Sequence, residues 1–102
     1  MMRISFERTG GFAGIRLATT VDSAALSPEE AAQLRTLVDN AKFFSLPARI
    51  KTTASGADRF QYTVTVETLD QRHTVVVDES AAPPELRPLL NWLTTTAKTK
   101  KP

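Results

Sequence analysis

The sequence predicts an α+β fold: a two-layer sandwich in which a four-stranded, mostly antiparallel sheet packs against two helices. Four segments alternate apolar and polar residues with a period of two, which is typical of strands with one buried face. Two further segments repeat apolar residues at helical spacing, which is typical of helices with one buried stripe. Their order along the 102-residue chain is strand, strand, helix, strand, strand, helix (ββαββα). Elements with one apolar face each pack as two layers around one core.

The first two strands are predicted on either side of the glycine-rich segment Gly10-Gly11-Phe12-Ala13-Gly14. Alternate positions are apolar or β-branched on both sides: Met2, Ile4 and Phe6 before it, and Ile15, Leu17, Thr19 and Val21 after it. Glycine adopts positive φ without a steric clash, so this hairpin tip can bend sharply or approach a partner closely. Phe12 is unusual at such a tip. Because burying its ring is worth about 1.5–3 kcal/mol, either its own domain or a partner should cover it.

The first helix is predicted to begin at Ser27-Pro28-Glu29-Glu30, which combines a serine N-cap, a proline and the glutamate of a capping box. Its apolar stripe consists of Leu34, Leu37, Val38 and Ala41, and we expect it to end near Asn40 or Lys42. Residues 43–47 are interpreted as an apolar plug that closes the core. Residues 48–58 predict a long surface loop, which leaves room for one short extended piece around Ile50.

The second pair of strands is predicted over residues 59–67 and 72–78. Phe60, Tyr62, Val64 and Val66 form one apolar face, and the valine run at residues 75–77 indicates a central strand. The second helix carries the stripe Leu86, Leu89, Leu90 and Leu93, with Pro88 at or near its start. We expect one domain over residues 1–97 and a basic flexible tail over residues 98–102. Alternating strand directions also predict that residues 10–14, 48–58 and 79–84 gather on one rim of the sheet.

The composition argues against an enzyme. The chain has no cysteine and one histidine, His73, which lies within a predicted strand, so zinc sites of His and Cys and Cys-His pairs are excluded. No glycine pattern for phosphate binding occurs. The carboxylate pairs, such as Glu29 and Glu30, are explained by the start of a helix or the end of a strand. We therefore expect a protein that is not an enzyme and that needs no metal and no other cofactor.

Five segments, taken in order, resemble the emfourin family: residues 11–15 (Gly-Phe-Ala-Gly-Ile), 43–47 (Phe-Phe-Ser-Leu-Pro), 56–62 (Gly-Ala-Asp-Arg-Phe-Gln-Tyr), 72–75 (Arg-His-Thr-Val) and 84–93 (Pro-Glu-Leu-Arg-Pro-Leu-Leu-Asn-Trp-Leu). The likeness covers nearly the whole chain, from about Arg3 to Leu93. Emfourins are small proteins of cytoplasmic type that inhibit protealysin-like members of the thermolysin family of zinc metallopeptidases. In bacteria they are typically encoded beside such a peptidase. The resemblance implies an inhibitor that occludes a peptidase cleft by tight, non-covalent binding.

The hairpin tip is the candidate for the inhibitory segment. Thermolysin-like peptidases resemble one another in preferring a bulky apolar side chain just after the scissile bond, and Phe12 between small residues suits such a pocket. We therefore predict peptidase contacts at Gly10, Gly11, Phe12, Ala13 and Gly14, with secondary contacts on the rim at Arg49, Lys51, Asp58 and Arg59. The alternative is that Phe12 folds onto the end of its own sheet and that the rim charges are only solvated.

Two other kinds of partner compete with this reading. The net charge of +2 suggests nucleic acid, but Lys98, Lys100 and Lys101 supply three of the 13 basic side chains, which leaves 10 against 11 acidic ones. Such a nearly neutral body exerts little long-range attraction on phosphate. A self-association module that uses a free sheet edge is the other alternative. We expect a monomer that binds neither nucleic acid nor membrane, and, because the N-terminal sequence has no apolar export signal, a cytoplasmic one.

Overall fold

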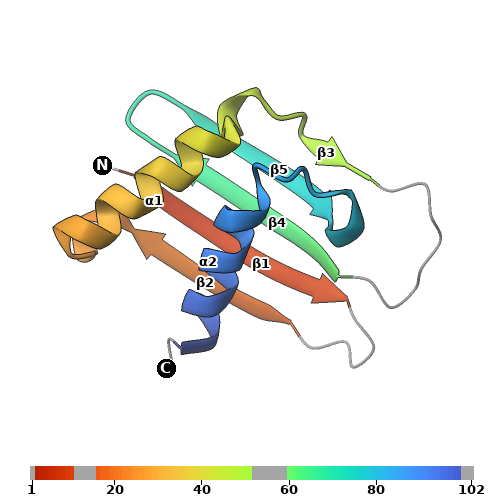
Figure 1. The fold of residues 1–102 in the computed structure, drawn as a ribbon, viewed down its shortest axis with the longest axis horizontal. Coiled ribbons are helices and arrows are strands. Elements are labelled where there is room, and N and C mark those ends of the chain that lie inside the picture. Colours follow the sequence, from red (N-terminus) through yellow and green to blue (C-terminus); the bar gives the residue numbers. More distant parts are fainter. Residues whose placement is uncertain (1, 11–15, 52–59, 100–102) are drawn as a thin grey trace.

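A computed structural model describes residues 2–10, 16–51 and 60–99 of the chain. Five strands form one sheet in the order β2-β1-β4-β5-β3. Their bounds are Arg3–Gly10 (β1), Leu17–Asp22 (β2), Arg49–Ile50 (β3), Phe60–Glu67 (β4) and Arg72–Asp78 (β5). Two α-helices, α1 (Pro28–Ala41) and α2 (Arg87–Thr99), and short 3₁₀ turns complete the described part (Figure 1).

The α+β class with two helices is confirmed, but the expected number of four strands is wrong. The additional strand, β3, pairs in parallel with β5 through Arg49 opposite Val76 and Ile50 opposite Val77, which makes the sheet mixed. The backbone N–H of Val76 also donates to the carbonyl oxygen of Ala48 at 2.8 Å. A strand of two residues is too short for a period-two pattern, so alternation in the sequence could not reveal it. It lies where the sequence left room for an extended piece.

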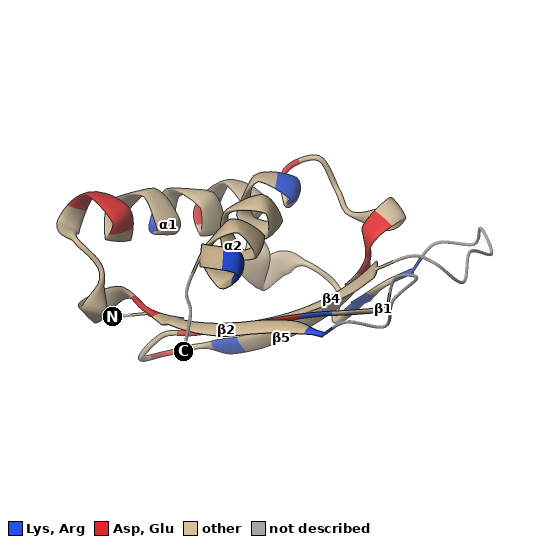
Figure 2. Cartoon of the chain, turned by 90° about the horizontal axis from the view of Figure 1, so that it is seen from below, with Lys and Arg blue, Asp and Glu red and all other residues tan. Residues whose placement is uncertain are grey.

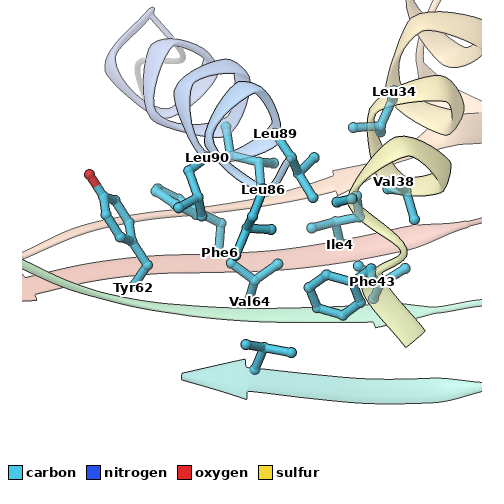
Figure 3. Close-up of a cluster of buried hydrophobic side chains, with 14 of the residues drawn as sticks. Ile4, Phe6, Leu34, Val38, Phe43, Tyr62, Val64, Leu86, Leu89 and Leu90 are labelled. Atoms are coloured by element: carbon cyan, nitrogen blue, oxygen red, sulfur yellow. The ribbon is translucent and has the colours of Figure 1, made fainter. Parts of the chain in front are cut away.

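Both helices lie on the same face of the sheet, and Figure 2 shows that no helix of the described part covers the opposite face. The core fills the space between the two layers (Figure 3). Its members are the buried apolar side chains of β1, β2, β4, β5 and both helices, together with Met2, Phe43, Ala82 and Leu86. The most completely enclosed are Phe43, Ile4, Leu34, Leu86, Leu89, Leu93, Val21, Val64, Val66, Val75 and Val77. The predicted stripes and strand faces therefore form one core.

The ends of α1 agree with the sequence prediction. Ser27 Oγ accepts a hydrogen bond from the Glu30 backbone N–H at 3.2 Å, and Glu30 Oε1 accepts from the Ser27 backbone N–H at 3.4 Å. This reciprocal pair is a capping box. The helix ends at Ala41, where Lys42 adopts the left-handed conformation with φ of 50° and its N–H bonds back to the Asp39 and Val38 carbonyls.

Helix α2 extends further than the threonine-rich sequence suggested. It begins at Arg87, so that Pro88 lies in the first turn, and it continues through Thr94, Thr95 and Thr96 to Thr99. Thr94 Oγ1 donates to the Leu90 carbonyl at 2.7 Å, which keeps this hydroxyl bonded within the helix. The helix therefore includes Lys98, the first residue of the expected tail, while residues 100–102 lie outside the described part.

Candidate functional site

Four strand termini lie at the same end of the sheet, where β1 ends, β4 begins and both β3 and β5 end (Figure 1). Gly10 lies opposite Phe60, Gln61 lies opposite Asp78, and Ile50 lies opposite Val77. We call this edge the strand-end rim and define it by Gly10, Ile50, Phe60 and Asp78. Of the segments predicted to gather on one rim (10–14, 48–58 and 79–84), the described parts reach this rim at Gly10, in β3 and directly after Asp78, while residues 11–14 and 52–58 lie outside the described residues.

The structure describes three of the predicted site residues. Gly10 ends β1 with φ of 89°, a conformation that favours glycine. Arg49 lies in β3 and Lys51 directly follows β3, and both are exposed next to the rim. Gly11, Phe12, Ala13, Gly14, Asp58 and Arg59 lie outside the described residues. Gly10, Arg49 and Lys51 are thus brought to the same edge of the sheet.

A cluster around Arg8 lies on the helix-covered face beside the rim, and the sequence analysis missed it. The Arg8 guanidinium carbon lies 4.1 Å from the centre of the Phe60 ring, which is a cation–π contact. Tyr62, the register partner of Arg8, is hydrogen-bonded through its side chain to Arg8 and to Thr94 of α2. The Tyr62 ring also packs on the Phe6 ring, with centres 5.9 Å apart. We call Arg8, Phe60 and Tyr62 the Arg8 cluster.

The Arg8 cluster has an uneven electrostatic environment. Burial raises the pKa of the Tyr62 hydroxyl above 10.0, and the negative charge of Glu79 raises this pKa further, whereas the Arg8 guanidinium lowers it. Arg8 Nε is buried and has no hydrogen-bond partner among the described residues. The signal that could have revealed the cluster is positional: Arg8 continues the inward series of Ile4 and Phe6 and faces Tyr62 across the strand pair.

The uncovered face of the sheet carries polar rows rather than a catalytic group. Thr20, Ser5, Thr65 and Thr74 lie side by side across four strands, and the Thr65 and Thr74 hydroxyl oxygens are 2.8 Å apart. A shallow hollow of about 490 Å³ lies on this face, lined by Ser5, Phe6, Glu7, Ala18, Thr19, Thr20, Thr63 and Thr65. The Glu7 carboxylate in it is ion-paired with Arg16 at 2.8 Å. Hydroxyls and one neutralised carboxylate give hydrogen bonding but no nucleophile with an adjacent base.

Other chemistry finds no support in the described part. Residues 2–10, 16–51 and 60–99 contain no group of three His, Cys, Asp or Glu side chains that could hold a metal ion. His73 Nε2 lies 2.7 Å from the Leu46 carbonyl oxygen, so its ring joins two segments of the fold. Within the same ranges, neither helix has the length and apolar character that crossing a bilayer requires.

Comparison with known proteins agrees with the resemblance in the sequence. The family model described as emfourin matches residues 6–94. Among solved structures, the chain is similar to emfourin (M4in) from Serratia proteamaculans, an M4 family peptidase inhibitor, with 22% identity and a TM-score of 0.46 over 92% of this chain and 88% of that one. None of the curated protein sequences compared with the chain matches it. Because the family model spans most of its length, this chain belongs to the emfourin family, whose members are peptidase inhibitors and not enzymes.

Proposed function

We propose that this protein inhibits a thermolysin-like, protealysin-type zinc metallopeptidase by occluding its active-site cleft without forming a covalent bond. The inhibitory segment is residues 10–14, and the Phe12 side chain is the apolar anchor. Membership of the emfourin family is the observation that carries the inhibitor role. The position of Gly10 at the strand-end rim supports the choice of segment, because a departing chain there has a paired strand behind it.

The scaffold behind Gly10 suits a segment that must bind without being cleaved. Strand β1 is held on both sides, by β2 from Arg3 to Arg8 and by β4 along its whole length to Gly10. A substrate must distort toward the transition state before its peptide bond breaks. A segment whose first residue is paired with β4, at the end of a strand that is held on both sides up to Arg8, resists this distortion and stays bound intact. Because the first residue of the segment is already held in place, the segment also loses less conformational entropy when it binds.

Contacts around the anchor complete the proposal. An aromatic side chain in a deep pocket, surrounded by weaker contacts that exclude water, is the usual arrangement of a protein–protein hot spot. Arg49 and Lys51, exposed beside the rim, are the described members of this surrounding set, and Asp58 and Arg59 are its remaining members.

The experiment compares Phe12 with Leu69, an exposed apolar side chain at the turn between β4 and β5. Purified protein is mixed with a thermolysin-like peptidase and peptide hydrolysis is followed. We expect Phe12→Ala to weaken inhibition by about a hundredfold, the loss of a hot-spot side chain worth more than 2 kcal/mol. Leu69 lies at the β4–β5 turn, away from the rim, and is 86% exposed, so Leu69→Ala is the matched control and should inhibit as the wild type does.

The outcome that contradicts the proposal is the reverse pattern. If Phe12→Ala folds and inhibits normally, the anchor is wrong. If Leu69→Ala alone loses inhibition, the binding surface lies at the other end of the sheet. We also propose that the protein is a monomer, that it resides in the cytoplasm and that it binds no nucleic acid. Sizing chromatography over a concentration range, cell fractionation and a salt series test these three points separately.

A further inference from the structure

We propose that Arg8 is a positioning residue for the inhibitor: it fixes the ends of β1 and β4 in one arrangement and so holds Gly10, the first residue of the proposed inhibitory segment, in place. This inference rests on the proposed function. It concerns only how the described side chains hold the strand-end rim, and it assigns Arg8 no direct contact with a peptidase.

The contacts of Arg8 bridge the elements that form the rim. Arg8 lies two residues before Gly10 on β1, and its guanidinium stacks over Phe60, the first residue of β4 and the register partner of Gly10. The same side chain is hydrogen-bonded to Tyr62, which is bonded in turn to Thr94 of α2. One side chain therefore connects β1, β4 and α2 at the point where β1 ends. Figure 3 shows Tyr62 beside α2, on the same side of the sheet as Phe6 and Leu90.

Stability alone does not explain an arginine at this position. Arg8 follows Ile4 and Phe6 in the inward series of β1, where an apolar side chain would bury surface favourably. The arginine instead leaves Nε buried without a hydrogen-bond partner among the described residues, which is destabilising. Its stacking on Phe60 offsets this cost only in part. The contact exchanges some stability for a directional attachment, since a planar guanidinium specifies geometry that a leucine does not.

A fixed rim matters because a binding segment that is already ordered loses less entropy when it docks. Immobilising each additional flexible side chain makes the binding free energy less favourable. Loosening the first residue of β4 and the last residues of β1 would add this cost for several groups at once. We expect the loss to be seen mainly as faster dissociation of the complex, as for other preorganised binding surfaces.

The first test compares two arginines of the same strand. Arg8→Leu keeps the apolar stem and removes the guanidinium, and it should weaken inhibition of a thermolysin-like peptidase about tenfold, the effect of about 1.4 kcal/mol. Arg3→Leu is the matched control: Arg3 begins β1 at the far end, and its exposed side chain is 3.6 Å from the Asp22 carboxylate. The control should stay within about twofold of the wild type, because exposed ion pairs contribute little. Equal inhibition by both variants overturns the proposal.

A double-mutant cycle then asks whether Arg8 acts through the inhibitory segment. If it does, Arg8→Leu will weaken inhibition far less in the Phe12→Ala background than in the wild type, because the segment that Arg8 positions no longer carries the anchor. An equal loss in both backgrounds means a general effect on the fold and overturns the proposal. If Phe12→Ala alone changes nothing, the anchor of the proposed function fails, and the comparison of Arg8→Leu with Arg3→Leu alone decides the role of Arg8.

Hydrogen exchange gives a readout in the free protein that does not depend on any peptidase. Arg8→Leu should speed amide exchange at the Gly10–Phe60 end of the β1–β4 ladder and leave the Arg3–Glu67 end unchanged. Should Arg8→Leu fail to fold, Tyr62→Phe replaces it, because it keeps the ring and removes only the hydroxyl that bonds to Arg8. Unchanged exchange at the rim in the variant that folds overturns the proposal.

Discussion

His73 Nε2, on β5, lies 2.7 Å from the carbonyl oxygen of Leu46, in the segment that leads from α1 to β3. The imidazole also meets the buried Phe43 ring edge-on, with ring centres 5.7 Å apart. Two residues after Leu46, the Ala48 carbonyl oxygen accepts a hydrogen bond from the backbone N–H of Val76, which lies on β5 as His73 does. The histidine thus attaches the connecting segment to β5 just before β3 pairs with it.

We expect His73→Phe to lower the free energy of unfolding by about 1–2 kcal/mol, because the ring contact survives while the Leu46 carbonyl loses its donor. Urea denaturation measures this change. The exposed neighbouring residue provides the control, and Arg72→Ala should alter stability by less than about 0.5 kcal/mol. Inhibition should be unaffected, because His73 pairs with Val66, away from the strand-end rim. Equal stability of the two variants would contradict the bracing role of His73.

The capping box of α1 gives a second prediction. Ser27→Ala removes the oxygen that accepts the Glu30 N–H, and we expect a loss of about 1 kcal/mol in unfolding free energy. The reason is that an N–H in the first turn has no partner within the helix. Ser80→Ala, at an exposed serine outside both α-helices, is the control and should be nearly neutral. Thermal unfolding followed by circular dichroism distinguishes the two, and equal melting temperatures would exclude a stabilising cap.

The two adjacent phenylalanines after α1 give a third prediction. Phe43 is 1% exposed, whereas Phe44 is only partly buried against the core. We expect Phe43→Ala to cost about 3–5 kcal/mol, through lost burial and the cavity left behind, and Phe44→Ala to cost clearly less. Urea denaturation of both variants measures the difference. Similar losses would mean that the two rings share the core equally.

This pair also shows how far the sequence could predict the fold. Adjacent apolar residues in a 3₁₀ turn have no period, so the sequence identified the plug at residues 43–47 but could not tell which ring fills the core. The absence of a period also explains why β3 could not be predicted: its two residues are extended because they pair with β5. Long periodic segments were predictable, because a stripe or an alternating face is visible along one element: four strands and both helices are where the pattern placed them.

The candidate site was predictable only in outline. Strand directions follow from the order of the elements, and they placed the strand-end rim correctly. The Arg8 cluster was not predictable, because it depends on the register between β1 and β4, which neither segment shows by itself. In the sequence, Arg8 is only a charged residue at the end of an alternating segment. Its role becomes visible when the structure places Tyr62 and Phe60 next to it. Phe12 stays a prediction, because it lies outside the described residues.

The inhibitor should respond weakly to salt if an apolar anchor dominates binding. Screening at high ionic strength weakens exposed charge pairs but leaves apolar burial intact. We therefore expect the inhibition constant to change by less than about tenfold between low and moderately high salt, whereas a complex that depends on phosphate contacts weakens by about a thousandfold or more over a similar range. Inhibition assays at several salt concentrations measure this. A steep loss of inhibition at high salt would mean that Arg49 and Lys51 contribute more to binding than Phe12 does.

Tyr62 offers a direct probe of the Arg8 cluster, because it is the only tyrosine of the chain and its ionisation can be followed by ultraviolet absorbance without overlap from another phenol. Burial and the charge of Glu79 raise its pKa above 10.0, while Arg8 opposes them. Arg8→Leu should therefore raise the pKa of Tyr62 further. Arg3→Leu should leave the pKa where it is in the wild type.

The same shift fixes the sign of the pH dependence. Above about pH 10 the unfolded chain loses the Tyr62 proton while the folded chain keeps it, so the folded state binds more protons and stability falls as the pH rises. Tyr62→Phe removes this contribution, and its unfolding free energy should decline less steeply in the alkaline range than that of the wild type. Urea denaturation at a series of pH values measures both slopes. Equal slopes would mean that the pKa of Tyr62 is not raised in the folded protein, and that the hydroxyl is not buried in solution as it is in the structure.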